Sequence, residues 1–168
     1  MNLGTAGTAV PSAFIAASVT SREAQICRAS QAAEAAFERI AQTARVAQEH
    51  PTEFQDRVFS IFRWYFLSAF CTRLLSGAAH RMEHQTLQMS MDIISAVKMV
   101  LSDHEVEKAM TLVQKEQTCP TEVRANGIGA RGHMVGWVAA GLHKKGRDFP
   151  KEIESALAGA LAASGRLN

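Results

Sequence analysis

The stretch that decides the fold runs from Gln85 to Gln117, QTLQMSMDIISAVKMVLSDHEVEKAMTLVQKEQ, because apolar residues recur in it at helical spacing. They step by four, three, three and four positions, which places them on one helix face. This first stripe consists of Leu87, Met91, Ile94, Val97 and Leu101. Ser102 and Glu105 then have the spacing of a capping box, which opens a helix. A second stripe follows, formed by Val106, Ala109, Met110 and Val113. The pattern predicts one kinked helix or two consecutive helices.

An apolar stripe on a helix needs another helix to cover it. Two interpretations stay open: the stripe is the core of a helical bundle, or it is an assembly surface that packs on copies of the chain or on a partner. The residues expected to carry assembly are Leu87, Met91, Ile94, Val97, Leu101, Val106 and Val113.

Two more helices are predicted before this stretch. Thr20 and Glu23 form another capping-box pattern, which predicts a helix over about residues 21–48 with a narrow, alanine-rich stripe. Proline at position 51 ends it and suits the first turn of the next helix, predicted over 52–76. That second helix is rich in phenylalanine and is expected to be a buried central helix, or an exposed surface that touches a partner or a membrane. Arg63 in its middle argues against a stable membrane span.

The two ends of the chain differ in composition from this helical region, 21–117. Residues 1–20 carry no charge and are predicted to be disordered. Residues 118–168 read as a basic Gly/Ala-rich tail, with a small closing helix over 151–167. The sequence contains no strand pattern, which predicts an all-α fold: a loosely packed helical bundle or extended helices with a flexible N-terminus. Three widely spaced cysteines indicate reduced thiols and no disulfide framework, and no cofactor is expected.

The basic tail offers one alternative function, a DNA-binding regulator. Residues 121–142 have the small, turn and core positions of a helix-turn-helix motif at Ala125, Gly129, Val135 and Val138, although two glycines inside the second helix weaken it. The G-x-G-x-x-G match at 127–132 follows no strand, so a dinucleotide site is not indicated. Residues expected to contact nucleic acid in this alternative are Arg124, Arg131, His133, Lys144, Lys145 and Arg147.

A second alternative is a zinc-binding hydrolase. The segment 80–84, HRMEH, has H-x-x-E-H spacing, which on a helix places two imidazoles one turn apart. His80 and His84 would hold the metal and Glu83 would act as the base. A polar helix face explains the same residues, and the chain has no strands for the α/β domain in which such peptidases carry the motif.

Two stretches together resemble a known family. Pro11 to Ala44, which contains PSAFIAASVTSREAQ and AAEAAFERIAQTA, and Gln85 to Gln117 are similar to the two ends of the inner-rod proteins of bacterial type III secretion systems, and most similar to the rhizobial nodulation proteins of that type. The resemblance implies a non-enzymatic subunit that is made in the bacterial cytoplasm and then exported or assembled into the secretion apparatus of the cell envelope. It also implies self-association through the C-terminal helical region, contact with other apparatus subunits, and an export signal in the uncharged N-terminus.

Overall fold

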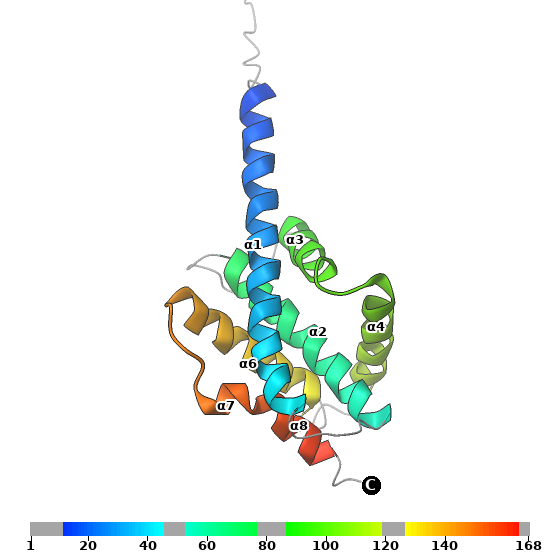
Figure 1. Cartoon of the computed structure of the whole chain (residues 1–168). Helices are drawn as coiled ribbons and strands as arrows, with labels where there is room; N and C mark the ends of the chain where they lie inside the picture. The colour runs from blue at the N-terminus through cyan, green and yellow to red at the C-terminus, as the bar shows by residue number, and fades with distance from the viewer. Residues whose placement is uncertain (1–11, 46–52, 77–86, 119–126, 165–168) are drawn as a thin grey trace, which may run out of the picture.

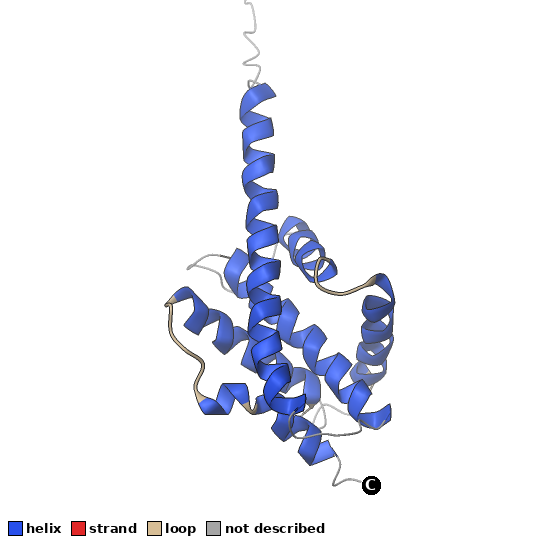
Figure 2. Ribbon diagram, in the orientation of Figure 1, coloured by secondary structure: helices blue, strands red, loops and turns tan. Residues whose placement is uncertain are grey.

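The computed structural model describes residues 12–45, 53–76, 87–118 and 127–164. These residues form seven helices and no strand (Figure 2), which confirms the all-α prediction for the described part of the chain. The helices are α1 (Ser12–Arg45), α2 (Glu53–Leu75), α3 (Leu87–Lys98), α4 (Asp103–Gln117), α6 (Ile128–Lys144), α7 (Lys151–Glu154) and α8 (Ala156–Ser164).

Helix α2 lies at the centre of the bundle. It contacts α1, α3, α4, α6 and α8, and Figure 1 shows α1 crossing it. Acidic Glu53 and Asp56 occupy its first turn and Arg73 its last, which matches the charges that a helix dipole favours at each end. By length and composition, α2 is also the one helix among the described residues that could cross a membrane. Within the bundle it buries Val58, Phe62, Phe66, Leu67, Ala69, Phe70 and Cys71.

A chain of phenylalanine rings forms the centre of the core. Phe62, Phe66 and Phe70 follow one another along α2 at four-residue steps, with centroid distances of 6.5 Å and 5.8 Å between neighbouring rings. Phe37 from α1 packs on Phe66 at 5.4 Å. All four rings are almost completely buried. Burying such a side chain stabilises a fold by about 1.5–3 kcal/mol, so these rings are a major source of stability.

Helix α6 packs on α2 with almost no side chain between the two backbones. A Cβ atom at Gly132 would lie 2.7 Å from the carbonyl oxygen of Phe62, and one at Gly136 would lie 2.3 Å from that of Phe66. Both distances are shorter than van der Waals contact, so only glycine fits at these positions. Residues 128–164, assigned by composition to a basic Gly/Ala-rich tail, thus supply α6, α7 and α8 to the same core.

Gly146 ends helix α6. Gly146 has a φ of 59°, the left-handed conformation that glycine adopts without strain. Its N–H donates to the carbonyl of His143 and the N–H of Arg147 donates to that of Leu142, each at 3.0 Å. This is the Schellman arrangement that ends many helices.

Helix α1 is longer at its start than the sequence pattern predicts. It begins at Ser12, so the pair Thr20 and Glu23 lies within the helix and not at its end. Residues 12–20, which were predicted to be disordered, are therefore helical. Figure 1 shows this segment projecting beyond the other described helices.

The predicted break between α3 and α4 is confirmed, which makes the stretch 87–117 two helices. The N–H of Ser102 donates to Glu105 Oε2 at 2.8 Å, and the N–H of Glu105 donates to Ser102 Oγ at 3.3 Å. This reciprocal pair is a capping box, and it satisfies two N–H groups at the start of α4.

Candidate functional site

Helix α3 has two apolar faces, and only one of them is covered by the bundle. The inner face buries Ile93, Ala96 and Val97. The opposite face, called here the outer face of α3, presents Leu87, Met91 and Ile94, which are 80%, 55% and 49% exposed, and ends in the exposed Lys98. Exposed apolar side chains that lie next to one another on a helix make this face a candidate interaction surface.

The structure divides the residues predicted to carry assembly. Leu87, Met91 and Ile94 lie together on the outer face of α3. Val113 is half-buried on α4. The remaining three are buried within the chain and belong to its core: Val97, Leu101 and Val106.

An ion pair holds α3 in place against α1. The guanidinium of Arg22 donates to both carboxylate oxygens of Asp92, with Nη2 2.6 Å from Oδ2 and Nε 3.1 Å from Oδ1. A two-pronged contact of this kind fixes orientation as well as distance. The outer face of α3 is therefore presented on a helix that is anchored by a buried apolar side and a lateral ion pair.

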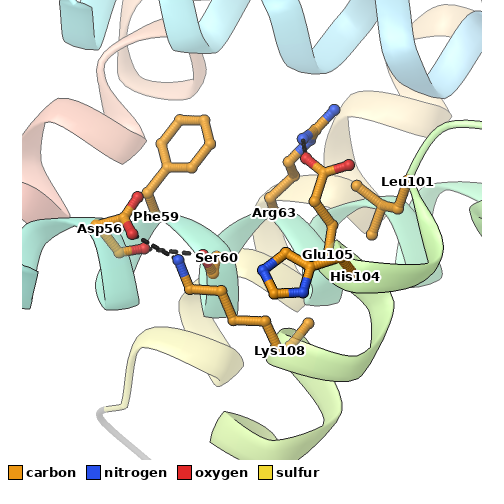
Figure 3. Close-up of a pocket in the computed structure, with 9 residues that line it drawn as sticks. Asp56, Phe59, Ser60, Arg63, Leu101, His104, Glu105 and Lys108 are labelled. Carbon is orange, nitrogen blue, oxygen red and sulfur yellow. Dashed lines mark hydrogen bonds and ion pairs between the residues drawn. The ribbon is translucent and has the colours of Figure 1, made fainter.

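A shallow pocket of about 170 Å³ lies between α2 and α4 (Figure 3). Lys108 Nζ on α4 is 2.5 Å from Asp56 Oδ2 on α2, and Arg63 Nη1 is 2.7 Å from Glu105 Oε1. The pKa of Glu105 is held below its usual value, first by the N–H of Ser102 and also by Arg63. The two ion pairs join α4 to α2, so the charged groups of this pocket are engaged in holding the two helices together.

The thiol of Cys71 is not suited to nucleophilic chemistry. It is buried, and its hydrogen bond to the carbonyl of Ala29 is 3.9 Å long. Burial raises the pKa of Cys71 to about 12, so the reactive thiolate is scarce near neutral pH. Across the described ranges, no group of three His, Cys, Asp or Glu side chains is placed to hold a metal ion. The H-x-x-E-H residues His80, Glu83 and His84 lie outside the described residues.

The residues of the helix-turn-helix alternative are spread over and around α6. Arg124 lies outside the described residues. Arg131 is exposed, whereas His133 is half-buried and stacks on Trp137 with centroids 6.3 Å apart. Burial lowers the pKa of His133. The proposed turn position, Gly129, lies inside α6.

The basic residues at the end of α6 have different surroundings. Lys144 Nζ donates to the backbone carbonyl of Arg73 at 2.7 Å, which ties the end of α6 to α2. Lys145 and Arg147 are exposed. Between Arg131 and Lys145, the exposed surface of α6 carries Met134 and Val138, so this surface is apolar at its middle.

Two features of this arrangement did not emerge from the sequence pattern. Ile93 and Ala96 form the buried inner face of α3 together with Val97. The sequence pattern had instead assigned Ile94, which is exposed, to the apolar stripe. Gly132 and Gly136 serve close helix packing, and their four-residue spacing was the available signal. No protein-family model matches the sequence, and comparisons with curated proteins and with solved structures find no match either.

Proposed function

We propose that this protein is a non-enzymatic, self-associating helical subunit of a bacterial type III secretion apparatus. The observation that supports self-association is the outer face of α3, where Leu87, Met91 and Ile94 are exposed side by side. Full burial of an exposed side chain of this kind is worth about 1.5–3 kcal/mol. Met91 and Ile94 are already about half buried, so an association that covers all three gains proportionally less from these two. Copies of the chain and other apparatus subunits are the proposed partners.

The assignment to a secretion apparatus rests on the resemblance of residues 11–44 and 85–117 to inner-rod proteins. The second of these stretches is the one that carries the outer face of α3, so the resemblance and the exposed surface concern the same part of the chain. In this proposal the chain is made in the cytoplasm, is exported or assembled into the cell envelope, and serves a symbiosis such as nodulation. The paired charges of the pocket between α2 and α4 support a structural role for that pocket.

Self-association is tested by sedimentation velocity of the full-length protein and of two variants. Ile94→Asp places a charge on the outer face of α3 and is expected to yield monomers with an unchanged helical circular dichroism spectrum. Ser95→Asp adds the same charge to an exposed position on the same helix, off the outer face, and is expected to leave the oligomer intact. A wild-type protein that stays monomeric at its highest soluble concentration contradicts self-association.

The secretion assignment is tested separately by export. A reporter fused after the first fifty residues is expressed in a bacterium with a defined type III apparatus, with and without the ATPase of that apparatus. Release that depends on the ATPase is the expected result. Retention of the reporter inside the cells of both strains removes the secretion assignment and leaves self-association to be judged on its own measurement.

A further inference from the structure

The exposed side of α6 is a stripe that is apolar at its middle and basic at both ends. It consists of Arg131, Met134, Val138 and Lys145, called here the α6 stripe. At about 100° per residue, these four positions fall on one side of the helix. The opposite side packs on α2 through Gly132 and Gly136, so the α6 stripe points away from α2. Residues 127–147 contain no acidic residue, and in the part of the chain that the structure describes neither Arg131 nor Lys145 has an ion-pair partner.

The exposed side of α4 is a stripe of the opposite charge. It consists of Asp103, Glu107, Met110 and Gln114, called here the α4 stripe, and all four residues are exposed. Val106 and Ala109 are buried on the inner side of the helix. The exposed residues His104 and Lys115 lie about a quarter turn to one side of the stripe. Among the described residues, Asp103 and Glu107 form no ion pair, so both carboxylates are open to a partner.

The two stripes match when the helices lie antiparallel. Placing Met110 beside Val138, the apolar residue at the middle of each stripe, sets the register. Asp103 then comes to the level of Lys145, because each lies seven positions, or about 10 Å, from the aligned pair. Glu107 lies one turn from Asp103 on the same stripe. The antiparallel direction also places the N-terminal end of α4 beside the C-terminal end of α6, where the two helix dipoles attract.

Charge favours this pairing over the other ways in which copies of the stripes could meet. Two α6 stripes would bring basic side chains together, and two α4 stripes would bring carboxylates together. Both stripes are exposed in the folded chain, so they do not cover each other within one copy. A second copy of the chain supplies the missing partner for each.

We propose that the α4 stripe of one copy packs antiparallel on the α6 stripe of a second copy. The two surfaces are different, so the contact is heterologous and can be repeated from copy to copy. It contains three large apolar side chains, those of Met110, Met134 and Val138, which is less than a stable interface needs by itself. It therefore joins copies that already associate through the outer face of α3. This inference rests on the proposed self-association and adds a second interface to it.

Charge reversal in the full-length protein tests the proposal by sedimentation velocity. Glu107→Lys cancels the negative charge of the α4 stripe and is expected to give a smaller oligomer than the wild type. Asp103→Asn and Glu107→Lys on α4, combined with Lys145→Glu on α6, exchange the charges of the two stripes and are expected to restore the wild-type size. Glu152→Lys makes the same substitution at an exposed position of α7 and is expected to sediment like the wild type.

Cross-linking tests the contact directly. Two differently tagged chains, each with Cys27 and Cys119 replaced by alanine, carry Met110→Cys and Val138→Cys respectively, and the buried Cys71 is retained. After mixing, a short bismaleimide is expected to join the two different chains. Glu152→Cys replaces Val138→Cys in the control and is expected to give background yield.

The outcomes separate this contact from self-association in general. The contact is overturned if Glu107→Lys keeps the wild-type size, if the exchanged charges do not restore it, or if positions 138 and 152 cross-link equally. Each of these results leaves association through α3 standing, whereas a wild-type monomer overturns both. Circular dichroism shows whether each variant is folded, and if a charge variant unfolds, the cross-linking yield decides.

Discussion

Replacing Gly136 by alanine is expected to destabilise the protein, against the usual effect of this substitution in a helix. The added methyl group would lie 2.3 Å from the carbonyl oxygen and 2.9 Å from the Cα atom of Phe66. Both are backbone atoms of α2 and cannot rotate away, so α6 and α2 must separate. The separation also loosens the contacts that α6 makes with the phenylalanine rings of the core.

The magnitude follows from two opposing contributions. Alanine is favoured over glycine inside a helix by about 1 kcal/mol. Forcing an extra methyl group into a packed interface costs about 1–3 kcal/mol, and the clash with backbone places Gly136 toward the upper end of that range. The expected net loss in the free energy of unfolding is therefore about 1–2 kcal/mol.

Urea unfolding followed by far-ultraviolet circular dichroism measures this free energy. Gly159→Ala is the matched control, because Gly159 lies in α8 and a Cβ atom there would meet no other atom within 4 Å. It is expected to stabilise the protein by up to about 1 kcal/mol. If Gly136→Ala stabilises the protein as much as Gly159→Ala does, the inference that the backbones of α6 and α2 touch at Gly136 is wrong.

Three further predictions concern the core, the cap and a thiol. Phe66→Ala is expected to lower the free energy of unfolding by about 3–5 kcal/mol, whereas Phe54→Ala, at an exposed position, costs far less; equal losses would contradict the central position of Phe66. Because the pKa of Glu105 is lowered in the folded state, its stabilising effect is present above the unfolded value near 4.5 and is lost as pH falls through the lower folded value. The difference in the free energy of unfolding between wild type and Glu105→Gln should then be present at neutral pH and vanish in acid, as measured by urea unfolding at a series of pH values. A difference that does not change with pH would contradict the lowered pKa of Glu105. Cys71 is expected to react with a thiol reagent only after unfolding, as followed by mass spectrometry, and immediate modification in the native protein would show that it is accessible.

Much of the fold was predictable because its signals are local. The central helix was predicted from a run of apolar residues between a proline and a glycine, and α2 occupies that run within a residue or so at each end. The spacing of Ser102 and Glu105 predicted the start of α4, since a capping box depends on four consecutive residues alone. The start of α1 was placed too late because Thr20 and Glu23 match a capping box by sequence, whereas the chain is already helical there.

The surface of α3 and the packing of α6 depend on residues far away in the sequence. Ile93 and Ile94 are adjacent and equally apolar, and which of them is buried is decided by where α1 and α2 lie. Gly132 and Gly136 weaken a helix when it is considered alone, so they counted against the helix-turn-helix motif. They allow close packing only because the backbone of α2 lies beside them, and the local sequence does not show that neighbour.

The close packing of α6 on α2 also determines when the chain can fold during its synthesis. The hydrogen bonds from Arg73 to the carbonyl of Trp137 and from Lys144 to the carbonyl of Arg73 join residues 64 and 71 positions apart. Contacts between such distant positions form slowly, because a long loop must close before they are made. While α6 is still inside the ribosome, the face of α2 that receives it lacks the helix that covers it in the folded chain. The packing of α2 on α6 can therefore form only after the chain has been translated past the end of α6.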